Sequence, residues 1–216
     1  MENKTALLDK IKKRAKNLIS GANSCHEWDH TERVYELAMR IGKKEKADLE
    51  ILGLACILHD VAREKEDESE GKICHAERGA ILARDILKKN GVEEEKIEKI
   101  VHCIETHRFR GNKVPKSKEA KILYETDKLD AIGAIGIGRA FSFAGHIGTK
   151  IHDKEIDLEK TKQYSVDDCA YREYLVKLRY IKDKMFTKEG KKIAKERHKF
   201  MEKFFERLNK EVDGEI

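Results

Sequence analysis

Apolar side chains recur at helical spacing through nearly every segment of this chain. Residues three, four and seven apart carry them, as in LLDKIKKRAKNLI near the beginning and HAERGAILARDILKK further on. Runs in which valine, isoleucine, threonine and aromatic residues alternate with polar ones are too short to indicate a sheet. The sequence therefore predicts an all-α protein. Hydrophobic residues make up 39% and charged residues 40% of the chain, which at this spacing indicates charged helix surfaces over an apolar core.

One helix is expected at the centre of the fold. From about Asp48 the segment LEILGLACILHDVA is apolar almost all round, which is typical of a helix enclosed by others. Gly21 and Gly42 are expected to end the two helices before it. The glycine-spaced AIGAIGIG, residues 131–138, has no preceding strand, so it indicates tight packing between two helices rather than a dinucleotide site. Two long charged helices should finish the chain, the first opening at Ser165-x-x-Asp168.

Length and composition also limit the organisation and the location of the protein. The 216 residues suit one domain over residues 1–216, with core motifs between about 24 and 143 and a helical extension over about 165–212. No apolar run is long enough for a membrane span, and no signal-peptide core is present, so we expect a cytoplasmic protein. Five cysteines without a C-x-x-C pair favour reduced thiols over disulfides.

The net charge of +5 arises from 46 basic and 41 acidic residues that are mixed at short range. Such mixing is typical of solvated helix faces, and it makes nucleic acid an unfavoured partner. A homodimer is left open, since the last two helices could pack on a second copy or close the bundle of their own chain.

The stretch CHEWDH contains H-E-x-x-H, the pattern that places two zinc ligands and a glutamate base on one helix in metalloproteases. That reading requires a helix already formed at His26, whereas the preceding GANS resembles a helix start. A zinc protease that uses His26, Glu27 and His30 is therefore kept only as the less favoured alternative.

A second unusual feature is Leu58-His59-Asp60, at the end of the most apolar helix. Burying an unpaired carboxylate costs several kcal/mol, so Asp60 should meet a cation or a set of hydrogen-bond donors. Asp127 is another acid in a mostly apolar helix. By themselves these residues also fit a structural histidine–aspartate pair.

The order H, then HD, then a distant D resembles the HD-domain metal-dependent phosphohydrolases. The resemblance extends over successive blocks and is closest to the small stand-alone HD hydrolases of bacteria and archaea. These blocks are DHTERVYELA, LACILHDVARE, HAERGAILARDIL, IETHRF and EAKILYETDKLDAIGAIGIGRAF.

The resemblance implies an HD-type helical bundle in which a divalent metal is held by four residues. The implied ligands are His30, His59, Asp60 and Asp127. Two imidazoles and two carboxylates suit manganese, iron, cobalt, nickel or zinc, and magnesium is also a candidate. In some relatives, intermediate histidines hold a second metal or orient phosphate, and His75 and His107 occupy those places.

The resemblance further implies hydrolysis of a phosphorylated small molecule, with a nucleotide as the expected substrate. Asp60, Arg33 and Lys128 are the expected catalytic residues. The expected substrate-binding residues are Arg33, His75, His107, Lys128, Asp130 and Arg139. A non-catalytic helical module that binds nucleic acid or a nucleotide is the alternative from a different class.

Overall fold

The structure, a computed structural model, describes residues 2–19, 28–69, 72–108 and 113–216. The chain divides into two compact units, Met1–Asp127 and Lys128–Ile216, each with buried apolar residues of its own. The expectation of one HD-type domain over residues 1–216 stays a prediction.

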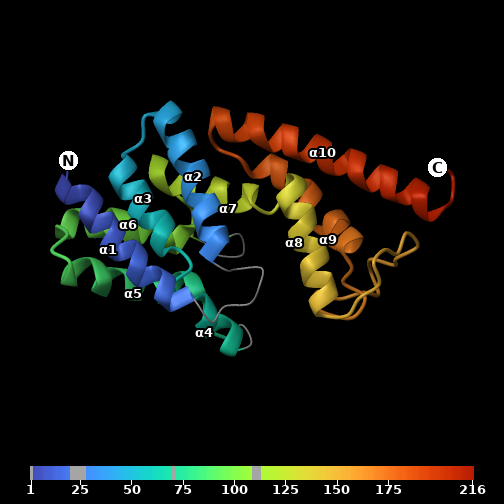
Figure 1. Ribbon diagram of the computed structural model, residues 1–216, viewed down its shortest axis with the longest axis horizontal. Helices are drawn as coiled ribbons and strands as arrows, with labels where there is room; N and C mark the ends of the chain where they lie inside the picture. Colours follow the sequence, from blue (N-terminus) through green and yellow to red (C-terminus); the bar gives the residue numbers. More distant parts are fainter. Residues whose placement is uncertain (1, 20–27, 70–71, 109–112) are drawn as a thin grey trace. The chain divides into compact units, whose positions relative to one another are not determined.

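Helices, turns and loops account for the described residues, without a strand, and this confirms the all-α prediction. None of the helices within these ranges combines the length and apolar character that a membrane span requires. The helices of the first unit, shown in Figure 1, are α1 (Glu2–Ile19), α2 (Trp28–Glu45), α3 (Leu49–Leu58), α4 (Arg63–Glu68), α5 (His75–Lys89), α6 (Glu94–Thr106) and α7 (Lys118–Leu129), the last of which continues into the second unit.

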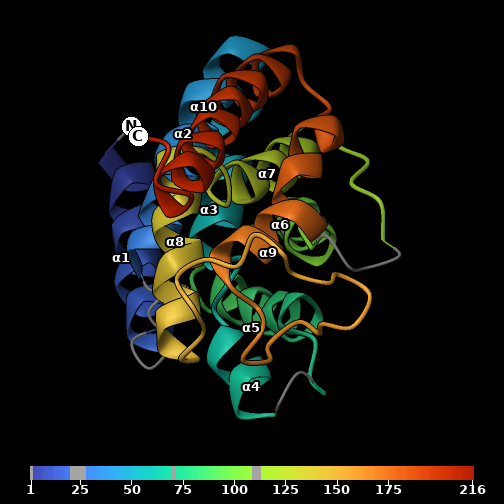
Figure 2. The same ribbon diagram turned by 90° about the vertical axis from the view of Figure 1, so that its right-hand side faces the viewer.

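Helix α3 is the centre of the first unit, as its sequence predicts. Asp48 begins it by accepting hydrogen bonds from the backbone N–H groups of Glu50 and Ile51, at 2.9 and 3.1 Å. Every residue from Ile51 to Leu58 is buried. Helices α1, α2 and α6 pack around it in both views (Figure 1, Figure 2). Because α3 is enclosed on all sides, the residues that follow its last turn begin inside the protein.

Helix α2 continues past Gly42, where the sequence predicted its end. Its last residue is Glu45, and Lys46 then takes a left-handed conformation with φ of 56°. Gly42 is buried, and a Cβ there would lie 2.7 Å from Cδ2 of Leu52. The prediction was wrong because this glycine permits close packing of α2 on α3 rather than a left-handed end. Gly21 lies outside the described residues.

The helices of the second unit differ from the predicted ones in two places. Helix α8 includes most of the glycine run, which was expected to lie between helices. The two long terminal helices are replaced by a short α-helix, a 3₁₀ helix and one long α-helix. The elements of this unit are α8 (Gly133–His146), α9 (Ala170–Val176), η1 (Leu178–Lys184) and α10 (Lys188–Val212).

Asp168 does not open a helix with Ser165, as the capping pattern predicted. Its carboxylate accepts hydrogen bonds from the backbone N–H of Tyr164 at 2.7 Å and from Nη1 of Arg172 at 2.8 Å. Both members of the Asp168–Arg172 pair are buried. The capping prediction was wrong because the same carboxylate pairs with the arginine of α9 and holds the loop before it.

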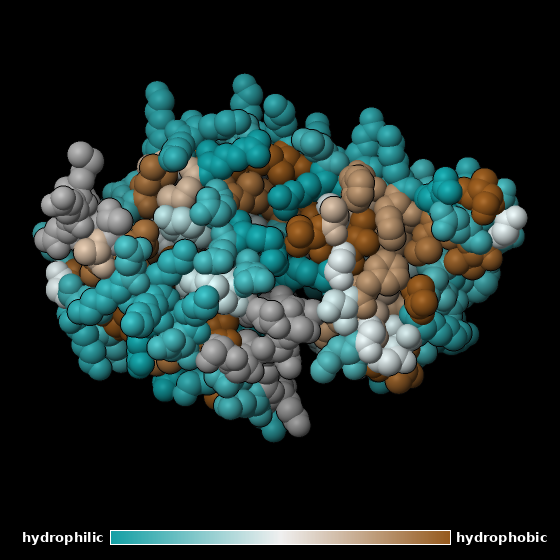
Figure 3. Space-filling view, viewed as in Figure 1, coloured by the Kyte–Doolittle hydropathy of each residue, from teal (hydrophilic) through white to brown (hydrophobic). Residues whose placement is uncertain are grey.

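The surfaces of the two units differ in the view of Figure 3. Hydrophilic side chains cover most of the first unit there, as the mixed charges of its helices predict. Over α8 in the second unit, apolar side chains gather, and Ile135 is 43% exposed.

Candidate metal centre

The first residue of the candidate site, His30, is brought into the interior by the buried face of α2. His30, Val34, Ala38 and Ile41 follow one another at spacings of four, four and three, and all are buried. This spacing places them on one side of a helix. His30 is the polar member of that stripe and is 2% exposed.

His59 and Asp60 enter the site because they follow directly on the buried helix α3. His59 ends that helix with helical backbone angles and is fully buried, and Asp60 is 3% exposed. Asp127 comes from α7, and its side chain is 20% exposed. All four residues that the sequence nominated as metal ligands belong to the first unit.

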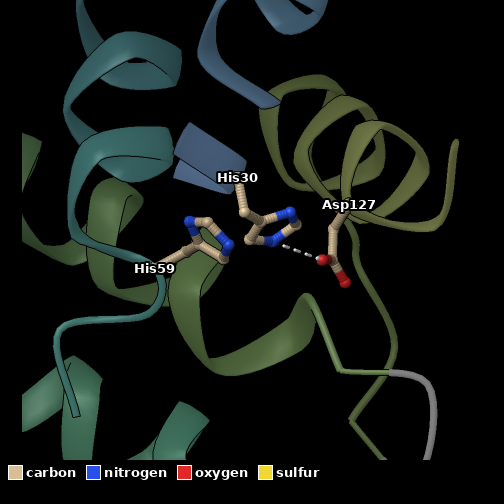
Figure 4. A group of neighbouring side chains, drawn as sticks. All are labelled: His30, His59 and Asp127. Atoms are coloured by element: carbon tan, nitrogen blue, oxygen red, sulfur yellow. Dashed lines mark ion pairs between the residues drawn. The ribbon is translucent and has the colours of Figure 1, made fainter. Parts of the chain in front are cut away.

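The structure brings these four side chains together. Nε2 of His30 lies 3.3 Å from Oδ1 of Asp127 and 3.7 Å from Oδ2 of Asp60. Nε2 of His59 lies 3.5 Å from the same Asp60 oxygen. Figure 4 shows the two rings and the Asp127 carboxylate converging from α2, the end of α3 and α7. One ligand atom from each of His30, His59 and Asp127 lies within 4.8 Å of the others, which is close enough for one ion to reach all three.

His59 is held in the form that can bind a metal. Its Nδ1 lies 2.7 Å from the backbone oxygen of Cys56, and because a carbonyl only accepts, Nδ1 carries the proton and Nε2 keeps its lone pair. Burial lowers the pKa of His59 to about 4. The ring is therefore neutral at pH 7. Its Nε2 is buried and makes no hydrogen bond to the described residues, so a cation fits this site.

A second group of ligand atoms lies on the other side of Asp60. Its Oδ1 is 3.4 Å from Nε2 of His75 and 3.7 Å from Nε2 of His107. Nδ1 of His107 donates to the backbone oxygen of Ile104 at 2.6 Å, so Nε2 of His107 also keeps a lone pair. The Asp60 carboxylate thus offers one oxygen to His30 and His59 and the other oxygen to His75 and His107.

Nε2 of His75 and Nε2 of His107 lie only 3.1 Å apart. His75 directs its Nδ1 at the Glu66 carboxylate, at 2.5 Å. When both rings carry their proton on Nδ1, two lone pairs face each other, and this arrangement requires a proton or a metal ion between them. The contact is therefore the second observation that fits a cation at this site.

Glu66 and Arg108 belong to this surrounding and were missed in the sequence. Burial raises the pKa of the Glu66 carboxyl, but hydrogen bonds from His75 and the charge of Arg108 outweigh it and lower the pKa to about 2. Burial lowers the pKa of His75, and its hydrogen bond with Glu66 opposes that change. Glu66 lies in the charged run EKEDESE, where no periodicity distinguishes one glutamate from the next.

The nominated phosphate-binding residues lie in both units. Arg33 follows His30 by one turn of α2 and is partly buried. Lys128 directly follows Asp127 in α7 and is 8% exposed. In the second unit, Nη1 of Arg139 donates to Oδ2 of the buried Asp130 at 2.7 Å. His26 and Glu27, on which the protease alternative depends, lie outside the described residues.

Comparison with known proteins identifies the family of this chain. The family model of the HD domain matches residues 28–132. The protein YpgQ of Bacillus subtilis is 34% identical over 210 residues, which cover 95% of this chain and 94% of YpgQ. This chain belongs to the HD-domain family.

Solved structures of relatives resemble this chain over nearly its full length. A crystal structure of Bacillus subtilis YpgQ in complex with ADP has a TM-score of 0.76 and 30% identity, and the match covers 97% of this chain and 96% of that one. An HD-superfamily hydrolase from Bacillus thuringiensis has a TM-score of 0.76 and 30% identity, with 97% and 98% covered. The Bacillus thuringiensis relative supports a hydrolase, and two groups of this chain, His30–His59–Asp127 and His59–Asp60–His107, are able to hold a metal ion.

Proposed function

We propose that this protein is a metal-dependent phosphohydrolase that cleaves a phosphoester or phosphoanhydride bond of a nucleotide. The observation that carries the proposal is the meeting of two imidazoles and two carboxylates from three separate parts of the chain. His30, His59 and Asp60 are buried, and their ligand atoms would be unfavourable there without a cation.

His30, His59, Asp60 and Asp127 are the residues that would hold the first ion. Nitrogen and oxygen donors in equal number suit manganese, iron, cobalt, nickel or zinc, and magnesium is less well matched to the nitrogens. A divalent ion bound there supplies Lewis acidity, which polarises a phosphoryl oxygen and lowers the pKa of a bound water.

His75 and His107, with the second oxygen of Asp60, are the residues that would hold a second ion. This assignment is supported by the hydrogen bond of His107 Nδ1 to Ile104, which leaves Nε2 as the ligand atom, and by the 3.1 Å separation between the two Nε2 atoms. Asp60 would then serve both ions, and for this reason we propose it as the most important residue of the centre.

The substrate is proposed to be a nucleotide because the relative YpgQ has been crystallised with ADP. Arg33 and Lys128 would contact its phosphates, since Arg33 lies one helical turn from His30, Lys128 directly follows Asp127, and both carry a positive charge. Asp130 and Arg139 form an ion pair, so Asp130 would orient the arginine rather than meet the substrate itself.

The proposal is tested on the full-length protein by metal analysis, followed by phosphate or pyrophosphate release from a nucleotide panel with manganese, cobalt, nickel or magnesium. We expect bound transition metal in the wild type, and loss of both metal and activity in Asp60→Ala and Asp127→Ala. The matched control is Asp85→Ala, which removes an exposed carboxylate of α5 and should change neither. Circular dichroism should show the helical content retained in all three variants.

The alternative of a nucleic-acid-binding module is decided by the same preparation. It predicts polynucleotide binding that weakens steeply with salt, without stoichiometric metal and without product release from any nucleotide. That result would overturn the phosphohydrolase proposal.

A further inference from the structure

Glu66, a residue of the short helix α4, makes two contacts with His75 through one oxygen. Its Oε2 lies 2.5 Å from Nδ1 of the His75 ring and accepts the backbone N–H of the same residue at 2.9 Å. Glu66 is only 7% exposed. A buried carboxylate in this position fixes both the start of α5 and the orientation of the imidazole that follows it.

The other oxygen of Glu66 is held by Arg108. Nη2 of Arg108 donates to Oε1 at 2.6 Å, and Nη1 of the same guanidinium donates to Sγ of Cys74 at 3.1 Å. Arg108 thus compensates the charge of the buried carboxylate and also contacts the residue that precedes His75. The carboxylate cannot turn away from the imidazole without breaking this ion pair.

A competing contact at the same nitrogen can be excluded by donor and acceptor chemistry. Nη1 of Arg63 lies 3.2 Å from Nδ1 of His75. A guanidinium only donates, so this contact would need a bare Nδ1, whereas the carboxylate of Glu66 needs a protonated one. Both cannot be hydrogen bonds. The Glu66 contact is shorter by 0.7 Å, the difference between 3.2 and 2.5 Å, and is supported by the second bond to the backbone.

We propose that Glu66 is a positioning residue, which keeps a proton on Nδ1 of His75 and directs Nε2 toward Asp60 and His107 as the ligand atom. The consequence for metal binding rests on the proposed function, whereas the consequence for the tautomer does not. An outer carboxylate of this kind orients a ligand and typically changes metal affinity by about 10- to 100-fold.

The test uses ¹⁵N nuclear magnetic resonance of histidine side chains in the full-length, chelator-treated protein at pH 8, above the ordinary pKa of imidazole. We expect the wild-type His75 to show a protonated Nδ1. In Glu66→Ala this preference should be lost. The control, Glu68→Ala, removes an exposed carboxylate from the same helix and should keep the wild-type signals.

A second variant guards against misfolding. If Glu66→Ala does not fold, Glu66→Gln replaces it in the test, because it keeps the side-chain volume and removes the charge. This variant should weaken the preference for a protonated Nδ1 of His75. Two results would overturn the assignment: a wild-type His75 with an unprotonated Nδ1, which is the form that the Arg63 contact demands, or a folded Glu66 variant with the unchanged wild-type state of Nδ1.

Manganese titration of the same proteins separates this inference from the proposed function. We expect two equivalents per wild-type chain, with the weaker one reduced at least about 10-fold in affinity by Glu66→Ala and the tighter one kept. If each manganese equivalent bound Glu66→Ala with the same affinity as the wild type, the metal role of Glu66 would be refuted, and the phosphohydrolase proposal would stand. A wild type that binds no metal would refute the proposed function, and the tautomer would still decide whether Glu66 positions His75.

Discussion

Substitution of Gly136 by alanine should destabilise the protein, although alanine is the better helix former. Gly136 lies inside α8, and a Cβ there would be 2.2 Å from the backbone oxygen of Ala131 and 2.4 Å from its carbonyl carbon. Ordinary contact begins at 3.4 Å, so the Ala131 carbonyl would have to withdraw by about 1 Å. The obstacle is backbone, which cannot rotate aside as the end of a side chain can.

The expected size of the effect follows from two opposing contributions. Overfilling a packed site usually costs about 1–3 kcal/mol and sometimes more. Replacing glycine by alanine inside a helix returns about 1 kcal/mol. Because this clash is with backbone, we expect the upper part of the first range, and a net loss of about 2 kcal/mol. For a chain of this size that corresponds to a decrease in Tm of roughly 4–8 °C.

Gly138→Ala is the matched control, since Gly138 lies two residues further along the same helix. A Cβ there would meet nothing within 4 Å. Only the gain in helix propensity remains, and Tm should rise by a few degrees, from about 0.5–1 kcal/mol. Thermal unfolding of both variants, followed by circular dichroism, measures the difference. A Gly136→Ala protein that melts at or above the wild type would refute the argument from the Ala131 contact.

Three further predictions test other parts of the molecule. Gly42→Ala should lower the free energy of unfolding by less than about 1 kcal/mol, because the only close contacts of its Cβ would be the ends of two leucine side chains, and thermal unfolding should therefore rank it above Gly136→Ala. In chelator-treated protein, the pKa of His59 is about 4, below its unfolded value of 6.5. The contribution of His59 to the free energy of unfolding is therefore fully present above pH 6.5 and is lost as the pH falls toward 4. Urea unfolding should show that the free energy of unfolding of the wild type falls by on the order of 3 kcal/mol in acid, and that His59→Gln lacks this decrease. An equal decrease in both proteins would contradict the lowered pKa. Asp130→Asn should cost roughly 1–3 kcal/mol in urea unfolding, because Arg139 loses a charged partner, and an unchanged midpoint would argue against a structural role for the pair.

The class of the fold could be predicted from the sequence because helical spacing depends on neighbouring residues alone. The enclosed helix α3 was predicted for the same reason, since a segment apolar on all sides has to be buried. The glycines were less informative. Gly42 and Gly136 were taken as helix ends or as residues between helices, and they serve close packing within helices. That role depends on partners, Leu52 and Ala131, whose approach no local pattern encodes.

In the candidate site, too, some residues were predictable from local sequence and others were not. His30 lies on a predictable apolar stripe, and Asp60 was conspicuous because a carboxylate at the end of an apolar helix needs a partner. Their meeting with Asp127, which follows Asp60 by 67 positions, was expected only from the resemblance to HD hydrolases. Glu66 was not expected at all, because one glutamate in a charged run differs from its neighbours only through the tertiary contact that it makes.

Because the chain divides into two units, substitutions that affect metal binding can be separated from those that affect Asp130 and Arg139. Every residue proposed as a metal ligand lies between His30 and Asp127, in the first unit, whereas Arg139 and its partner Asp130 lie in the second. Metal affinity should therefore respond to substitutions in the first unit, and the effects of Asp130 and Arg139 should fall on stability or on substrate affinity. The covalent link between the two sets is α7, in which Asp127 and Lys128 are consecutive residues of one helix.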